Sequence, residues 1–193
     1  MSDSMRDSPG TSPEAISISF PDVSSAGDAD FVAALVDIVQ VAYSEAEEGI
    51  FVPGYQRTNS AEVARLIRDG QLAVACLKEG MKPVGCIMVR IISPDRGNFG
   101  MLALDAAHRG GGVGRQLVLF AEGSCRDKGC TVMHLELLVP TTFNHGSKER
   151  MQAWYMRMGY RIVQLAQFGQ GYPALAPLLA GPTEYRIFEK ALA

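Results

Sequence analysis

Residues 100–122, GMLALDAAHRGGGVGRQLVLFAE, decide how the rest of the chain is interpreted. The stretch opens with an apolar run, residues 101–104, becomes polar, and then reaches three consecutive glycines at positions 110–112. Beyond the glycines, apolar residues recur from Val113 to Ala121 at the spacing of one helix face. The pattern predicts a strand, a glycine-rich turn and the N-terminus of a helix.

The segment from Arg109 to Arg115, called the glycine turn below, is suited to binding an anion. The first backbone N–H groups of a helix have no intrahelical partner, and the macrodipole adds partial positive charge there. Glycine permits positive φ and lets a phosphate approach the backbone closely. The two arginines would add charge-assisted hydrogen bonds. We interpret the segment as a pyrophosphate-binding turn; the alternative is a turn that only reverses the chain.

Two other phosphate-binding motifs do not fit these glycines. A P-loop needs lysine directly after its last glycine, and a dinucleotide fingerprint counted from Gly110 needs a glycine at the same position, which is Arg115 here. The turn instead resembles the Arg-x-x-Gly-x-Gly signature of the GNAT superfamily of acyl-CoA-dependent N-acyltransferases, at residues 109–114. The spacing from Leu104 to Gly110 is similar to that family as well. Its usual proline two residues after the hydrophobic position is Ala106 in this chain.

A second segment, residues 153–160 (AWYMRMGY), is similar to the Ala-x-aromatic-Tyr-x-x-x-Gly-aromatic sequence of that family. The resemblance implies that Tyr155 lies beside the coenzyme sulfur and protonates the leaving thiolate. The residue seven positions earlier is Lys148, where the family usually has an asparagine that contacts the coenzyme. A lysine there would meet a phosphate instead. The alternative for Tyr155 is an aromatic residue that only packs in the core.

The resemblance extends from about residue 16 to the C-terminus and implies the acyl-CoA N-acyltransferase fold. That fold is α+β, with a mixed, mostly antiparallel sheet of about seven strands flanked by about four helices. The implied reaction moves acetyl from acetyl-CoA, a co-substrate, to a primary amine by direct attack and without a metal. The implied coenzyme-binding residues are Leu102, Ala103, Leu104, Arg109, Gly110, Gly111, Gly112, Val113, Gly114, Arg115 and Lys148.

Periodicity and turn signals place the remaining elements. Expected strands cover residues 16–20, 72–77, 83–92, 99–104, 131–139, 160–167 and 183–190. Expected helices cover about residues 31–42, residues 59–70 with a capping box at Asn59 and Glu62, residues 113–127 and residues 147–158. Residues 168–182, rich in glycine and proline, are expected to form a loop.

Composition and charge narrow the class of protein. With 193 residues, 47% hydrophobic and 20% charged, the chain suits a single soluble domain over residues 14–193, after a disordered tail at residues 1–13. A net charge of −3 favours neither nucleic acid nor an anionic membrane as a partner. No apolar run approaches the roughly 20 residues of a membrane helix, and the N-terminus is polar. We therefore expect a cytoplasmic protein.

The four cysteines show neither a CxxC pair nor metal-ligand spacing with the three histidines. They are Cys76, Cys86, Cys125 and Cys130. We expect reduced thiols and no metal site.

A general base is expected on the strand at residues 131–139, which in the GNAT family parts from the strand carrying residues 102–104. Glu136 and His134 share one face of it, and either could take a proton from the acceptor amine. The alternative is that both are solvated strand residues. By the resemblance, the backbone at residues 102–104 pairs with the pantetheine arm, and one N–H group there faces the thioester oxygen.

Acceptor choice is expected to depend on the loop between the first two helices, the turn around His145 and the loop at residues 168–182. Acidic side chains could attract a cationic amine and aromatic ones could enclose it: Glu45, Glu47 and Glu48, with Tyr43, Tyr55 and Phe168. Arg57 could instead pair with a carboxylate of an amino-acid-like acceptor.

The sequence favours a small-molecule amine as the acceptor. Protein or peptide N-acetylation is the other enzymatic hypothesis. A non-catalytic acyl-CoA sensor, with the glycine turn intact and no productive acceptor site, is the third. The oligomeric state is left open, a homodimer included.

Overall fold

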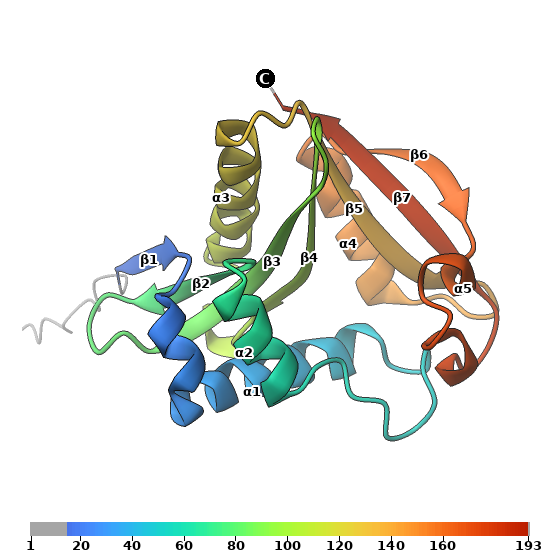
Figure 1. The fold of residues 1–193 in the computed structure, drawn as a ribbon. Helices are drawn as coiled ribbons and strands as arrows, with labels where there is room; N and C mark the ends of the chain where they lie inside the picture. Colours follow the sequence, from blue (N-terminus) through green and yellow to red (C-terminus); the bar gives the residue numbers. More distant parts are fainter. Residues whose placement is uncertain (1–14, 193) are drawn as a thin grey trace, which may run out of the picture.

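A computed structural model describes residues 15–192 of the chain (Figure 1). Their strands form one seven-stranded sheet in the order β1-β2-β3-β4-β5-β7-β6. The strands are β1 (Ile16–Ser19), β2 (Leu72–Leu77), β3 (Pro83–Ser93), β4 (Arg96–Leu104), β5 (Val132–Pro140), β6 (Arg161–Ala166) and β7 (Thr183–Ala191). Neighbouring strands are antiparallel except β4 and β5, which are parallel. The predicted α+β class with a mixed, mostly antiparallel sheet is confirmed.

Helices cover both faces of the sheet. They are α1 (Ala29–Ala46), α2 (Ser60–Arg68), α3 (Val113–Asp127), α4 (Gly146–Arg157) and the short α5 (Phe168–Gly171). Alternate residues of β2 point to opposite faces: Leu72 and Val74 pack with α1 and α2, whereas Ala73 and Ala75 pack with α3. Because both faces of β2 are covered, its sequence is a continuous apolar run and does not alternate between apolar and polar residues.

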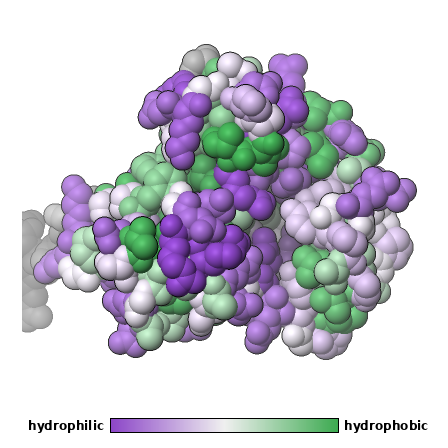
Figure 2. All heavy atoms as spheres, in the orientation of Figure 1, coloured by the Kyte–Doolittle hydropathy of each residue, from purple (hydrophilic) through white to green (hydrophobic). Residues whose placement is uncertain are grey.

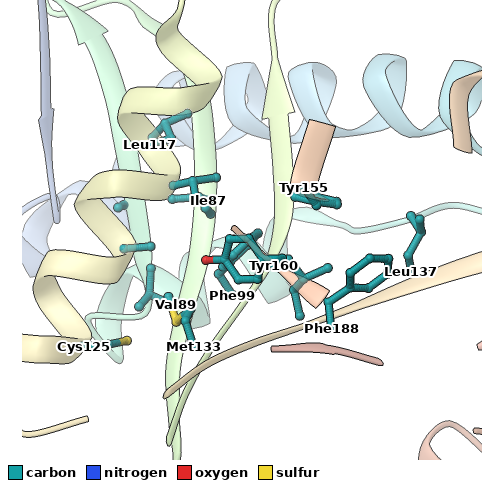
Figure 3. Close-up of a cluster of buried hydrophobic side chains, with 14 of the residues drawn as sticks. Ile87, Val89, Phe99, Leu117, Cys125, Met133, Leu137, Tyr155, Tyr160 and Phe188 are labelled. Atoms are coloured by element: carbon teal, nitrogen blue, oxygen red, sulfur yellow. The ribbon is translucent and has the colours of Figure 1, made fainter. Parts of the chain in front are cut away.

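The larger core cluster lies between the sheet and the pair α3 and α4 (Figure 3). Leu117 and Cys125 of α3 reach it from one side, and Tyr155 of α4 reaches it from the other. Phe99 of β4 lies between them, with its ring centroid 6.0 Å from that of Tyr155. The core is therefore continuous under the region where β4 and β5 separate.

A smaller cluster joins the α1–α2 connection to the chain between β6 and β7. Ile50, Phe168 and Tyr185 are buried in it. Two backbone hydrogen bonds connect the loops directly, from the N–H of Val52 to the carbonyl of Leu178 at 2.8 Å and from Ala180 to Ile50 at 2.9 Å. The two loops that we expected to govern acceptor choice are thus held against each other.

Most expected elements are present, with ends shifted by a few residues. The capping prediction for α2 is half right: Asn59 Oδ1 accepts the N–H of Glu62 at 2.9 Å, but the Glu62 carboxylate accepts from the Thr58 hydroxyl at 2.8 Å. The loop expected at residues 168–182 contains α5 and a short 3-10 helix, Ala176–Leu178. A four-residue helix with two glycines has too few residues for a helical period, so that expectation was incomplete.

The four cysteines are buried and form no disulfide bond with one another. The tail predicted to be disordered, residues 1–13, lies outside the described residues. Within residues 15–192, no helix is both long and apolar enough to span a bilayer.

Candidate functional site

The site begins where the parallel strands β4 and β5 separate. Their ladder covers only three pairs, from Arg96 with Val132 to Asn98 with His134. Beyond Asn98, the edge of β4 that would face β5 is left unpaired in the ladder. The open edge spans the apolar run that starts residues 100–122, so the sequence motif and the gap in the sheet coincide.

A bulge bends β4 at the point of separation. In the ladder with β3, Cys86 pairs with Ala103 and Met88 with Gly100, so β4 has one extra residue between those pairs. Met101 adopts φ 48° there, an uncommon conformation for a non-glycine residue. A bulge of this kind increases local twist and re-aims the strand, and it turns β4 away from β5.

The glycine turn connects β4 to α3. Gly110 and Gly112 adopt φ of 80° and 87°, and Gly112 is the N-cap of α3 without any side-chain cap bond. The first turn of α3 contains no acidic residue. A Cβ built at Gly110, Gly111 or Gly112 would meet no atom within 4 Å, so the space above the turn is open. Exposed helix N–H groups, open space and no carboxylate in the first turn of α3 suit an anion.

A first cavity of about 330 Å³, the β4 groove, starts beside this turn. It lies between the C-terminal end of α1, the open edge of β4 and α4. Its lining includes Ala42, Glu45, Ala103, Leu104, Arg109 and Trp154. The Arg109 guanidinium ion-pairs with Glu45 across the groove mouth, and Arg109 Nε lies 3.4 Å from the Leu104 carbonyl.

A second cavity of about 480 Å³, the central cavity, lies between β4 and β5. Its aromatic walls come from α1, the two joined loops and β7: Tyr43, Phe51, Tyr55, Phe168, Tyr172 and Tyr185. In the space-filling view this side of the molecule is hollowed between the part formed by α2 and the part formed by α5 (Figure 2).

The two cavities meet at one place. Tyr43, Leu102, Lys148 and Met151 line both of them. A molecule lying along the open edge of β4 would therefore reach the central cavity at Leu102. The arrangement can hold two ligands end to end.

Tyr155 lines the central cavity from α4 and is only 4% exposed. Its ring lies among those of Phe99, Trp154, Tyr160 and Phe188. Burial raises the pKa of its phenol well above the ordinary value. At neutral pH the hydroxyl is therefore protonated and able to donate.

Glu136 lines the central cavity from β5 within a small polar cluster. Its carboxylate lies 3.1 Å from His134 Nε2 and accepts from Asn98 Nδ2 at 3.2 Å. On its other side, His134 Nδ1 lies 3.6 Å from a Glu189 oxygen. Burial alone would lower the pKa of His134, but hydrogen bonds and charge from Glu136 and Glu189 raise it overall. Within this cluster, Glu136 can accept a proton, and His134 beside it can carry a positive charge.

Lys148 lies at the junction of the cavities and not at the glycine turn. Its side chain is 3% exposed, and its Nζ donates to Glu47 Oε1 at 3.3 Å. Burial lowers the pKa of Lys148, against the opposing charge of Glu47. The contact that a lysine here could make with a phosphate stays a prediction: Lys148 lines the β4 groove together with Arg109, whereas none of the turn glycines lines either cavity.

The structure brings most predicted residues together, in two groups. Tyr43, Arg57, Phe168, Glu136 and Tyr155 line the central cavity. Glu45, expected to attract the amine, instead lines the β4 groove and pairs with Arg109. His134 lines neither cavity but contacts Glu136, which lines the central cavity.

Sequence reasoning missed Arg90 and Asn98, which form a cross-strand pair on β3 and β4. Arg90 lines the central cavity, and Asn98 is 1% exposed. Neither residue belongs to a sequence motif, so the sequence offers no local signal for them. Among residues 15–192, no group of three or more metal-ligating side chains could hold a metal ion.

Comparison with known proteins agrees with this geometry. A model of the family described as "Acetyltransferase (GNAT) family" matches residues 35–160. No curated protein matches the chain significantly in sequence.

Solved structures share the fold at low identity. PaiA N-acetyltransferase from Thermoplasma acidophilum, in complex with coenzyme A, is 15% identical, with a TM-score of 0.67 over 92% of this chain and 99% of that one. An aminoglycoside 6'-N-acetyltransferase complexed with coenzyme A is 15% identical, with a TM-score of 0.65 over 91% and 97%. A chain of the NatC complex bound to Gag peptide and CoA is 16% identical, with a TM-score of 0.62 over 92% and 99%.

Proposed function

The chain belongs to the GNAT acetyltransferase family, and we propose that it moves an acetyl group from acetyl-CoA to the primary amine of a small molecule. One observation carries this proposal. The glycine turn, the β4 groove and the central cavity form a path that starts at an open helix N-terminus and ends among aromatic and titratable side chains.

The first part of the path fits coenzyme A. The free N–H groups at the start of α3 and the exposed Arg115 would hold the pyrophosphate. The unpaired edge of β4 at residues 102–104 would pair with the pantetheine amides, as an added strand does. Structural neighbours complexed with coenzyme A support this choice of ligand.

The chemistry needs few groups from the chain. Acetyl-CoA would supply the acetyl group on a thioester, whose C–S bond breaks as the new C–N bond forms. Glu136 would take the proton that the amine loses, and His134 beside it would hold that carboxylate in position. Tyr155 would donate the proton that the departing sulfur gains. A backbone N–H group of residues 102–104 would stabilise the carbonyl oxygen as it becomes negative.

A small acceptor fits the central cavity better than a peptide does. Hydrogen bonds between Val52 and Leu178 and between Ala180 and Ile50 join the loops on its rim. A peptide passing between those loops would have to break these bonds, whereas a small amine would not.

The test is acetyl transfer measured directly. The protein is incubated with acetyl-CoA and either a panel of small primary amines or a set of peptides with free N-termini. Thiol release and the mass of the acetylated product are followed together. We expect small amines to be acetylated. Transfer to peptides alone would favour the second enzymatic hypothesis, and tight coenzyme A binding without transfer to any amine would favour a sensor.

A further inference from the structure

Within residues 15–192, two of the arginines around the central cavity have no ion-pair partner. Arg57, in the α1–α2 connection, and Arg90, on β3, both line the cavity. Neither has a carboxylate within ion-pair distance among the described residues, whereas Arg65 at the same cavity is paired with Asp69 at 2.8 Å. Two guanidinium groups therefore face the cavity without an anionic partner.

The carboxylates of the cavity make their contacts with groups other than these two arginines. Glu47 Oε1 accepts from Lys148 at 3.3 Å, while its Oε2 is buried without a hydrogen-bond partner among the described residues. Glu62 accepts from the Thr58 hydroxyl at 2.8 Å. Glu136 lies 3.1 Å from His134 Nε2 and accepts from Asn98. Glu47 and Glu62 contribute to the raised pKa of Arg57, although burial opposes them, but neither reaches an ion pair with it.

Arg57 is held in place before any ligand binds. Its backbone N–H donates to Gln40 Oε1 at 2.8 Å, and Gln40 Nε2 donates to the Thr58 carbonyl at 3.1 Å. Its guanidinium carbon lies 4.8 Å from the centre of the Tyr43 ring. Apart from a side-chain hydrogen bond with Tyr43, stacking on the ring leaves the edge N–H groups of the guanidinium free for a planar anion.

Arg90 adds a second donor on the cavity wall. Its Nε is buried and has no hydrogen-bond partner among the described residues. A buried donor without a partner is costly and is usually satisfied by a ligand or by water. Arg90 pairs across the hairpin with Asn98, which contacts Glu136, so this donor lies on the same side as the proposed base.

We propose that the acceptor carries a carboxylate as well as its amine, and that Arg57 binds that carboxylate in the central cavity while Arg90 assists. This inference rests on the proposed function, since it names the class of acceptor for the same site. The acceptor is then amphoteric and amino-acid-like. The aromatic wall formed by Phe51, Tyr55 and Phe168 accommodates an apolar side chain.

A polycationic amine is disfavoured by the same charges. It would place extra positive charge beside Arg57, Arg90 and Lys148, while Glu62, Glu136 and one oxygen of Glu47 are already engaged by other groups. A monoamine without a carboxylate would leave the two guanidinium groups unpaired. The cavity therefore selects against both classes and for an acceptor that brings its own anion.

The test uses matched pairs of ligands that differ only in the carboxylate. L-phenylalanine with phenethylamine, L-leucine with isopentylamine and L-lysine with cadaverine are titrated by calorimetry into the full chain saturated with coenzyme A. Because free coenzyme A cannot donate an acetyl group, the result does not depend on turnover. We expect the carboxylate-bearing member of at least one pair to bind about 10- to 100-fold more tightly, as expected for charge-assisted hydrogen bonds.

Two variants assign the effect to the residue. Arg57→Gln should remove the difference between the members of the preferred pair while coenzyme A affinity stays unchanged, and Arg57→Lys should restore part of it. Arg68→Gln is the matched control, because Arg68 is an exposed arginine of α2 that does not line the cavity.

The result that would overturn the inference is separate from failure of acetyl transfer. Equal binding within every pair, tighter binding of the decarboxylated members, or no binding of any ligand would each show that the cavity does not select a carboxylate. Selective carboxylate binding without acetyl transfer would uphold the inference about the acceptor and contradict the proposed enzymatic function.

Discussion

The glycine turn and the central cavity are built in opposite ways. The turn presents backbone N–H groups and needs positions without side chains, such as Gly110 and Gly112. The central cavity is lined by side chains from α1, α2, two loops, four strands and α4. A site made of backbone leaves a short contiguous motif, whereas a site made of side chains leaves residues scattered along the chain.

The largest effect is expected where the β4 groove and the central cavity meet. Lys148→Met would leave Glu47 buried without its cation, and breaking a buried pair costs about 3–5 kcal/mol. For a chain of this size that lowers the melting temperature on the order of ten degrees. Thermal unfolding followed by circular dichroism measures it.

A double variant separates the pair from simple loss of packing. Lys148→Met combined with Glu47→Gln removes both charges and should recover part of the lost stability. Lys78→Met, at an exposed lysine, is the matched control and should have little effect. If Lys148→Met melts like the unaltered protein, the ion pair does not hold the junction together.

The next effect concerns catalysis in the cavity. Tyr155→Phe keeps the ring but deletes the hydroxyl that faces the leaving sulfur in our proposal. We expect kcat to fall by roughly 10²- to 10³-fold, within the range of a lost acid or donor, with coenzyme A affinity nearly unchanged. Steady-state kinetics and calorimetry on the same preparation measure both.

Tyr160 provides the control for that variant. It follows α4 and is 1% exposed, and its hydroxyl donates to Glu122 at 2.7 Å and not to the cavity. Tyr160→Phe should lower stability and leave kcat within a few-fold of the unaltered protein. A normal kcat in folded Tyr155→Phe would show that Tyr155 only packs in the core.

The smallest effect is a pH dependence of stability around His134. Because Glu136 and Glu189 raise its folded-state pKa above the unfolded value, the stabilisation from protonated His134 is fully present below the unfolded pKa near 6.5. It is lost as pH rises through the higher folded-state pKa. The stability difference between the unaltered protein and His134→Asn should therefore be larger at acidic than at alkaline pH. Melting curves across that range check the sign; a difference that grows with pH would contradict it.

The same comparison explains what could be predicted from the sequence. Three features could be predicted because the residues that define each of them are close together in the sequence. They are the glycine turn, α3 behind it and the segment that holds Tyr155. The mixed, mostly antiparallel sheet followed from the family resemblance that those motifs carry. α5 was missed because it is too short to show a period.

The residues of the central cavity could be predicted only in part, for a physical reason. Arg90 and Asn98 lie on adjacent strands, and Asn98 reaches Glu136, 38 residues farther along the chain, so no local pattern marks them. Glu45 was expected in the acceptor site because acidic residues cluster at the end of α1. It points instead to Arg109, while Glu47 two residues later reaches Lys148. Which carboxylate faces which cavity depends on the tertiary structure.

The most direct test of the two-region account is calorimetric titration of coenzyme A into Gly111→Val and Arg57→Gln side by side. Gly111 has no positive φ and open space around it, so valine there would block a phosphate without straining the backbone. The account predicts that Gly111→Val weakens coenzyme A binding about tenfold or more, through lost hydrogen bonds to a charged group. Arg57→Gln should bind coenzyme A as the unaltered protein does. Unchanged affinity in Gly111→Val, or a comparable loss in Arg57→Gln, would contradict the division of the site into a backbone region and a side-chain region.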